Sequence, residues 1–334
     1  MTWFETITGF PEESPQQVRE NITVEGQTLT SHANGRVLVY GRLETPTLAE
    51  LRERVHASGH PSGKISVREV VANVQHLHTD VSNAGSLFQV ASQFNLLEMV
   101  SPNYTPEDGV SIYEHDRTQG PACAIAAGAG TIYRNYFAIV NGQTGQSANN
   151  QIDCLADIGA ALGNTRSRLW EMRNGYALAS ERGLIEISHR LRESTEQGID
   201  ELRKLLRIGI QWDTQVTLRA SKHTVSQAYC SALPVAYCSH RLDLWERFAR
   251  LILQASYEST ICAAILNSRR KGSRKVFLTL LGGGAFGNPT EWIIEALERA
   301  VRLYEQFDLE VAVVSYGGSK DCVREIVNQF AIGR

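Results

Sequence analysis

The sequence has no marked excess of charge of either sign. Its 334 residues include 33 Lys and Arg against 36 Asp and Glu, so the formal net charge is −3. Proteins that bind nucleic acid take much of their affinity from a strongly basic surface, and this chain offers no such excess. No apolar run approaches the roughly 18 residues of a membrane span. We therefore expect neither nucleic acid nor a membrane as a partner.

Cysteine pairs at metal-binding or redox spacing are also missing. Six cysteines are scattered through apolar segments, and none forms a C-x-x-C pair. In a chain of this length, such cysteines indicate buried reduced thiols rather than a disulfide framework or a zinc site. The N-terminus lacks a basic segment followed by an apolar run, so we expect no secretory signal and a cytoplasmic location. We expect no metal and no cofactor.

The C-terminal part carries the clearest fold signal. Residues 276–281 (VFLTLL) form a continuous apolar run, as in a strand buried on both faces. A helix over 292–304, a strand over 309–315 and a helix over 321–330 follow, which requires parallel pairing through a right-handed crossover. This pattern predicts an α/β fold. Further helices are expected over 47–57, 67–77, 121–134, 151–162, 186–207 and 244–266, and strand material over 86–91, 170–179, 224–229 and 234–237.

A glycine-rich loop follows the buried strand. Gly282, Gly283, Gly284 and Gly287 fall within six residues, and Asn288 with Pro289 suits the start of the next helix. Glycines let an anion approach free N–H groups, and a helix N-terminus adds partial positive charge, so a phosphate or diphosphate is the expected ligand. A tight turn that binds nothing is the alternative.

The same loop formally matches the dinucleotide pattern G-x-G-x-x-G. That pattern also requires an acidic residue at the end of the next strand, where this chain has Ser315-Tyr-Gly-Gly318. An NAD-linked oxidoreductase is therefore the weaker alternative.

Polar side chains follow the strand expected over 86–91. Gln93, Asn95 and Glu98 come just after its carboxyl end, where ligands bind in open α/β sheets. Asp116 precedes the small-residue segment 121–134, together with Thr118 and Gln119. Asp116 suits a helix cap as well as it suits catalysis.

Four segments together carry a resemblance to a known family. FQVASQFNLLEM (88–99), YEHDRTQGPACAIAAGAGTIYRNYF (113–137), CSALPVAY (230–237) and FLTLLGGGAFGNPTEWI (277–293) resemble macrodomain-fold ADP-ribosyl hydrolases. The nearest class is a divergent one, related to a bacterial effector that removes ADP-ribose from arginine. The resemblance implies a three-layer α/β/α domain over 66–334 with a mixed, largely parallel sheet. Residues 1–65 would form an N-terminal extension packed on it.

The resemblance also implies an activity and a binding site. The chain would remove ADP-ribose from mono-ADP-ribosylated protein side chains, arginine above all; a non-enzymatic ADP-ribose reader is the alternative. Neither the Asn-Ala-Ala-Asn sequence nor the Gly-Gly-Gly…Gln-Glu-Glu motif of the family is present. The expected ligand-binding residues are Gln93 and Asn95 beside the distal ribose, Thr118, Gln119, and Gly282, Gly283, Gly284, Ala285, Phe286, Gly287 and Asn288 around the diphosphate.

The hydrolysis needs a carboxylate that orients or deprotonates water. Three residues are candidates: Glu98, Asp116 and Glu258. Glu258 lies three to four residues beyond the apolar stripe of the helix expected over 244–266, so it is expected to face inward. An exposed helical glutamate is the alternative for this residue.

Three other patterns are assigned no function. His76, His78 and Asp80 have metal-like spacing but no distant third ligand. The basic run 269–275 is expected to be a solvated helix end, with docking of an acidic or ADP-ribosylated partner as the alternative. Cys230 and Ser231 lack a motif-level base, so nucleophilic catalysis is not expected.

Overall fold

A seven-stranded mixed sheet forms the centre of the protein. The computed structural model describes residues 1–61 and 63–331. The strand order is β4-β11-β12-β6-β13-β14-β5, in which the four pairs from β12 to β5 are parallel and the two pairs made by β11 are antiparallel. This confirms the mixed, largely parallel sheet. Its strands are β4 (Arg42–Glu44), β5 (Ser66–Val71), β6 (Leu87–Ala91), β11 (Gly209–Gln215), β12 (Thr224–Cys230), β13 (Lys275–Leu278) and β14 (Glu310–Ser315).

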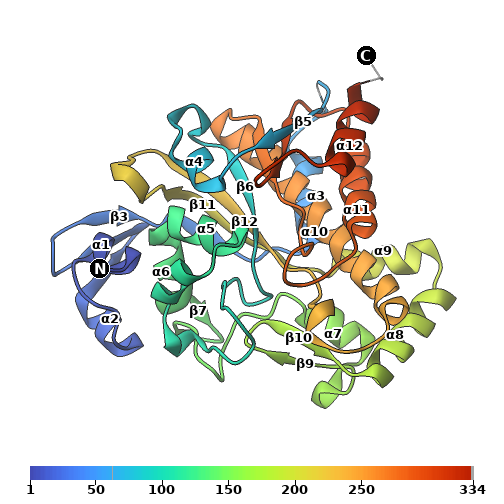
Figure 1. Ribbon diagram of the computed structural model, residues 1–334, viewed down its shortest axis with the longest axis horizontal. Helices are drawn as coiled ribbons and strands as arrows, with labels where there is room; N and C mark the ends of the chain where they lie inside the picture. The colour runs from blue at the N-terminus through green and yellow to red at the C-terminus, as the bar shows by residue number, and fades with distance from the viewer. Residues whose placement is uncertain (62, 332–334) are drawn as a thin grey trace.

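Helices cover both faces of this sheet (Figure 1). Successive residues of β6 show the two sides, because side chains alternate across a strand. Phe88 stacks on His78 of α4, whereas the side chain of Gln89 donates to Thr260 of α10. One layer therefore contains α4, α5 and α6, the other α10 with α3 and α11 packed on it. The predicted three-layer α/β/α architecture is confirmed.

The remaining elements have the following bounds. The helices are α1 (Trp3–Thr8), α2 (Pro15–Asn21), α3 (Leu48–Ala57), α4 (Val74–Thr79), α5 (Gln119–Ala126), α6 (Gly128–Tyr136), α7 (Ala156–Leu162), α8 (Glu181–Glu193), α9 (Glu196–Lys204), α10 (Leu242–Lys271), α11 (Thr290–Leu303) and α12 (Asp321–Ala331). Short 3₁₀ helices are η1 (Val81–Asn83), η2 (Pro106–Asp108), η3 (Ser111–His115), η4 (Thr165–Ser167), η5 (Leu218–Ala220) and η6 (Val235–Tyr237). Small sheets pair β1 (Ile22–Glu25), β2 (Thr28–Ser31) and β3 (Val37–Val39); β7 (Ile139–Val140) and β8 (Gln143–Thr144); and β9 (Trp170–Arg173) and β10 (Tyr176–Ala179).

Most of the predicted elements are present. The helices expected over 47–57, 244–266, 292–304 and 321–330 and the strands expected over 86–91, 224–229, 276–281 and 309–315 correspond to α3, α10, α11, α12, β6, β12, β13 and β14. The 170–179 segment is the β9–β10 hairpin, and the helix expected over 151–162 is confined to α7.

Two predicted elements have the wrong type. Residues 67–77 were expected to be one helix, but β5 takes their first half and α4 only the second. Full parallel pairing with β14 decides this, because each residue of Ser66–Val71 has a partner there. The strand expected over 234–237 is the 3₁₀ turn η6 instead.

Two predicted helices are each divided. The 121–134 segment breaks at Ala127, whose backbone leaves the helical region (φ −115°, ψ 53°). The 186–207 segment breaks before Thr195, whose hydroxyl accepts from Gly198 and caps α9. Periodicity alone continues across both breaks, so it did not reveal them.

The part before residue 66 does not form a uniform extension. Residues 1–39 build α1, α2 and the β1–β3 sheet around a second apolar cluster shared with α6. By contrast, β4 is an edge strand of the central sheet, and α3 packs on α10. Residues 42–57 are thus part of the three-layer core.

The N-terminal segment also holds a loop in place. The carboxylate of Glu12 accepts from the main-chain N–H groups of Val110 (3.0 Å) and Ser111 (2.6 Å), and from the Tyr136 hydroxyl (2.5 Å). A Cβ at Gly109 would come within 2.6 Å of that carboxylate. Glu12 therefore fixes the start of η3, which leads to Asp116.

Candidate functional site

A cavity of about 230 Å³ lies at the carboxyl ends of β6 and β13. These neighbouring parallel strands end at the same edge of the sheet, the usual ligand position in such folds. Three segments form the walls: the turn after β6, the entry to α5, and the glycine loop after β13. The cavity is lined by Ala91, Ser92, Gln93, Glu98, Met99, Val100, Asp116, Thr118, Gln119, Gly120, Pro121, Tyr176, Ala232, Tyr237, Thr279, Leu280, Leu281, Gly282, Gly284, Ala285 and Phe286.

The glycine loop is held in a defined shape. The hydroxyl of Tyr257 on α10 donates to the carbonyl of Thr279 (2.6 Å) and accepts from the Leu281 N–H (2.9 Å). Gly282 has φ +77°, and a Cβ there would lie 2.4 Å from the Cβ of Ala232. This close approach is why the position needs glycine.

Three consecutive N–H groups of the loop have no partner within the described chain. They belong to Gly284, Ala285 and Phe286, whereas the amides on either side donate to loop carbonyls. Unpaired N–H groups in a glycine-rich turn bind anions. The loop thus presents three N–H groups with unused hydrogen-bonding capacity beside the cavity.

Asn288 does not cap the next helix as expected. Pro289 occupies the N-cap of α11, and no side-chain cap bond forms. The Asn288 side chain instead donates to the carbonyls of Leu233 (2.8 Å) and Gly282 (3.3 Å). Its role is to fasten the glycine loop to the segment before η6, not to begin the helix.

Three aromatic rings form one wall of the cavity. The centroid of Tyr176 lies 5.1 Å from that of Tyr237 and 5.3 Å from that of Phe286, and the last two are 5.6 Å apart. The wall brings together β10, η6 and the glycine loop, so it presents apolar ring surface beside the free N–H groups.

Glu98 is a buried carboxyl group in the cavity lining. Its side chain is 1% exposed, and its Oε1 accepts no hydrogen bond from the described residues. Burial raises the pKa of Glu98 to about 7, although Arg134 acts to lower it. A carboxyl group poised near neutral pH inside a cavity is suited to acid–base chemistry.

Arg134 on α6 is the charged partner of Glu98. Arg134 is fully buried, and its Nη2 lies 3.4 Å from Glu98 Oε2. Its Nε donates to the carbonyl of Leu96 (2.9 Å). Leu96 has φ +66°, which turns the chain so that Glu98 faces back to the sheet. The main-chain N–H of Glu98 donates to the Tyr113 hydroxyl (3.1 Å).

The polar residues expected beside the ribose brace the turn instead. The Gln93 side chain accepts from the main-chain N–H of Met99 (2.8 Å) and donates to the Met99 carbonyl (3.1 Å). Gln93 lines the cavity, but its amide group is already used in these two bonds. Asn95 is fully buried, outside the lining, and bonded to Leu97 and Gln151. The structure therefore does not bring Asn95 to the cavity.

The residues before α5 divide between lining and support. Asp116 and Thr118 line the cavity, and Asp116 Oδ1 accepts from the Thr118 N–H (2.8 Å), leaving its second oxygen without a described partner. Gln119 also lines it, but its side chain clamps β6 through the Ala91 N–H (2.9 Å) and the Gln89 carbonyl (2.8 Å).

Glu258 is buried as expected but lies outside the cavity. Its carboxylate accepts from Arg52 (2.6 Å) and Arg299 (2.7 Å), which come from α3 and α11. Ser256 and Thr260 face the sheet, and residue 258 is rotated by about 200° from Ser256 around the helix. The catalytic expectation for Glu258 is corrected to a structural role, in which it ties three helices together.

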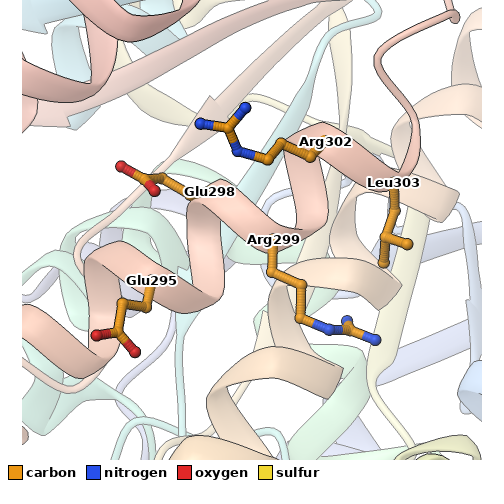
Figure 2. Close-up of a pocket in the computed structure, with 5 residues that line it drawn as sticks. All are labelled: Glu295, Glu298, Arg299, Arg302 and Leu303. Carbon is orange, nitrogen blue, oxygen red and sulfur yellow. The ribbon is translucent and has the colours of Figure 1, made fainter.

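A second, more open hollow of about 470 Å³ runs along α11. Figure 2 shows that its lining comes from this one helix, with Arg299 pointing away from Glu298 and Arg302. It contains charges of both signs but no free N–H groups and no buried carboxyl group of its own.

The patterns assigned no function each find structural partners. Of the three residues with metal-like spacing, His78 is buried, His76 contacts Arg219, and Asp80 caps η1. No group of side chains that could hold a metal ion occurs in residues 1–61 and 63–331. The basic run is only partly paired: Arg270 and Lys271 share Asp213, and Arg274 pairs with Asp308. Arg269 and Lys275 donate to the carbonyls of His60 and Ser82. No helix in the described ranges is long and apolar enough to cross a membrane.

Arg134, Tyr176 and Tyr237 were not recognised as site residues from the sequence, whereas Phe286 was. Arg134 lies in a segment with helical small-residue character, and Tyr176 belongs to a hairpin far along the chain from Glu98. No local signal marks them, because their role depends on contacts between distant segments.

Replacing the loop glycines tests the geometry of the glycine loop. Gly282→Ala should lower the free energy of unfolding by about 2 kcal/mol or more, because it adds a clash to a positive φ. Gly284→Ala is the matched control: nothing lies within 4 Å of its Cβ position, so we expect a change within about 0.5 kcal/mol. Chemical denaturation measures both, and equal effects would contradict the loop geometry.

Glu258→Gln tests the structural role of Glu258. Removing the buried charge should lower the free energy of unfolding by about 2 kcal/mol, since Arg52 and Arg299 lose one of their two shared carboxylates and keep Asp200. The affinity for ligands of the cavity, measured by calorimetry, should stay at the wild-type value. A loss of ligand binding in a folded variant would show that Glu258 contributes to the ligand site.

Comparison with known proteins gives similarity in fold without a family assignment. No protein-family model and no curated protein matches the sequence. The structure is similar to poly(ADP-ribose) glycohydrolase from Thermomonospora curvata, with 12% identity, a TM-score of 0.45, and coverage of 94% of this chain and 95% of the other.

Two ligand-bound structures are similar to the same degree. The enzyme from Deinococcus radiodurans in complex with ADP-ribose has 10% identity and a TM-score of 0.45 and covers 87% of this chain and 94% of its own. The T. curvata enzyme bound to the inhibitor ADP-HPD has 11% identity and a TM-score of 0.43, with coverage of 94% and 95%. Similarity at this level does not assign an activity to this chain, and none of these names the arginine-specific class.

Proposed function

We propose that this protein is a hydrolase that removes ADP-ribose from mono-ADP-ribosylated arginine side chains. The observation that carries the proposal is the meeting, in one cavity, of three unpaired N–H groups and the buried carboxyl group of Glu98. These two features are what an ADP-ribosyl bond requires: a diphosphate site and a titratable group beside it. The sequence resemblance supports the same substrate class.

The diphosphate would bind to the N–H groups of Gly284, Ala285 and Phe286. This site carries no lysine or arginine among its lining residues, which agrees with the chain's balanced charge. The rings of Tyr176, Tyr237 and Phe286 then provide an apolar wall for a ribose. Oriented binding of this kind supplies part of the rate enhancement by holding the anomeric carbon near the reacting groups.

Glu98 would act on the water that attacks the anomeric carbon. As a carboxylate it accepts the proton that the water loses while the new C–O bond forms. The C–N bond to the guanidine breaks, and the proton passes from Glu98 to the leaving guanidine, so that ADP-ribose and protonated arginine result. Partial ionisation near pH 7 allows Glu98 both to take up and to release this proton.

Asp116 supports the assignment of arginine as the acceptor. Its half-buried carboxylate has one oxygen without a described partner and lies near the Tyr176 ring, whose pKa is raised above its ordinary range by burial and also by Tyr237 and Asp116. A carboxylate beside aromatic rings is a suitable environment for a guanidinium group.

Glu98→Gln tests the catalytic assignment. We expect kcat on a mono-ADP-ribosylated arginine substrate to fall by about 10²- to 10⁴-fold. The dissociation constant for ADP-ribose should stay within about threefold, because the amide keeps the shape of the group. Release of ADP-ribose is followed by chromatography and binding by calorimetry. If the wild type binds ADP-ribose but releases none from any substrate, the chain is a reader; if it binds none, the site assignment is wrong.

The pH dependence follows from the pKa of Glu98. Because the carboxylate is the active form and its pKa is about 7, kcat/KM should rise about tenfold between pH 6 and pH 8 and then level. A rate that instead falls over this range would make Glu98 a general acid. The profile is measured at constant ionic strength with the same arginine-linked substrate.

Asp116→Asn tests the choice of linkage. We expect kcat/KM for the arginine-linked substrate to fall by about tenfold or more, because a charge-assisted hydrogen bond is lost. Hydrolysis of an ester-linked substrate or of poly(ADP-ribose), if detectable, should change little. An equal loss on all substrates would show that Asp116 serves the ADP-ribose part and not the acceptor.

A further inference from the structure

A chain of buried polar side chains leads from α4 along one face of the sheet to Glu98. His78 Nδ1 lies 2.8 Å from the Val74 carbonyl, and its Nε2 lies 3.0 Å from the side-chain nitrogen of Gln227. The Gln227 side chain is hydrogen-bonded to the Tyr229 hydroxyl, and this hydroxyl is hydrogen-bonded to Nη1 of Arg134. All these side chains are fully buried or nearly so, in the layer between the sheet and α4, α5 and α6.

Two main-chain carbonyls fix the direction of every bond in this chain. A carbonyl only accepts, so the Val74 carbonyl requires a proton on His78 Nδ1 and the Cys123 carbonyl (3.0 Å) requires the NH₂ of Gln227 to face it. The oxygen of Gln227 must then accept from the Tyr229 hydroxyl. Tyr229 is left to accept from Arg134, which only donates.

Arg134 has three hydrogen-bond partners besides Glu98. Besides Tyr229, the guanidinium donates to the Leu96 carbonyl (2.9 Å) and the Thr131 hydroxyl (3.3 Å), and its carbon lies 3.7 Å from the centre of the Tyr229 ring. Its separation from Glu98, 3.4 Å, exceeds the roughly 2.7–2.9 Å of a charge-assisted hydrogen bond. The ion pair between Glu98 and Arg134 is therefore long because the guanidinium is also held by Leu96, Thr131 and Tyr229.

Among the described residues, the other groups that interact with Glu98 are uncharged. Tyr113 from η3, Cys123 from α5 and Tyr229 from β12 face it. Burial raises the pKa of each of the three well above its ordinary value, and the charge of Glu98 adds to this effect, so all three stay neutral. Arg134 is thus the cation whose position sets the electrostatic environment of the Glu98 carboxyl group.

We propose that Tyr229, fixed by Gln227 and His78, is a positioning residue that holds the Arg134 guanidinium away from Glu98 and so leaves one carboxyl oxygen unpaired. The inference rests on the proposed function for its catalytic meaning, but the geometry and its test concern the protein itself. With Arg134 at this distance, Glu98 keeps a pKa of about 7; a closer arginine would fix it as a permanent carboxylate. His78 stays neutral, since burial lowers its pKa to about 4, so the chain keeps its direction at working pH.

Tyr229→Phe removes the hydroxyl that holds Arg134 and keeps the ring. We expect Arg134 to move toward Glu98 and the pKa of Glu98 to fall by about one unit or more. Carboxyl ¹³C NMR titration of glutamate-labelled protein measures this, and the signal that disappears in Glu98→Gln identifies residue 98. In activity, the rise of kcat/KM should move to lower pH while KM changes little, which a merely structural defect would not produce.

Gln227→Met is the second variant, because it removes the acceptor of the Tyr229 hydroxyl without touching Arg134. We expect this variant, like Tyr229→Phe, to lower the pKa of Glu98. His223→Asn is the control, since the His223 ring lies 2.8 Å from the main-chain carbonyl of His78 and makes no bond to the side chains of Gln227, Tyr229 or Arg134, and it should leave the titration unchanged.

The outcomes separate this inference from the proposed function. An unchanged or raised pKa of Glu98 in folded Tyr229→Phe and Gln227→Met overturns the positioning role, whatever the activity. A wild type without hydrolase activity overturns the proposed function, while a lowered pKa in the variants still supports the chain from His78 to Glu98.

Discussion

The long, fully buried ion pair between Glu98 and Arg134 is the interaction on which the site depends. Burying two charges costs free energy unless each finds partners, and here the arginine finds them in Leu96, Thr131 and Tyr229 rather than in the carboxylate alone. This requires β12 to lie beside β6 in its parallel register, with Tyr229 opposite Val90, and α6 to bring Arg134 to the Tyr229 hydroxyl. The electrostatic environment of Glu98 therefore depends on the order of the strands in the sheet.

The two faces of the sheet serve different purposes. On the α4–α6 face, polar side chains converge on Glu98 and on the cavity. On the α10 face, Glu258 joins Arg52 and Arg299 in a cluster that ties α3, α10 and α11 together. The faces meet at the glycine loop, where Tyr257 of α10 holds the main chain of Leu281. A buried carboxylate is thus found on each side, but only one borders the cavity.

The N-terminal segment supports the cavity without lining it. Glu12 fixes the start of η3, and Tyr113 within η3 accepts from the Glu98 N–H. Residues 1–39 therefore support the loop that carries Asp116, although they lie far from it in sequence. This gives the extension a physical role in shaping the site, through one carboxylate and one apolar cluster.

Local patterns in the sequence determined the α/β class, the β13–α11–β14 crossover and the glycine loop, because continuous apolar runs, helical periodicity and turn glycines act over a few residues. They also placed Glu98, Asp116 and Thr118 at a strand end and a helix entry, where the cavity is found. Only the tertiary structure decided which carboxylate borders it. Periodicity marked Glu258 as buried but not which neighbour it faces, and Arg134 and Tyr229 acquire their roles only when strands distant in sequence pair. Such choices depend on long-range register and on the free energy of burying charge, neither of which a short segment encodes.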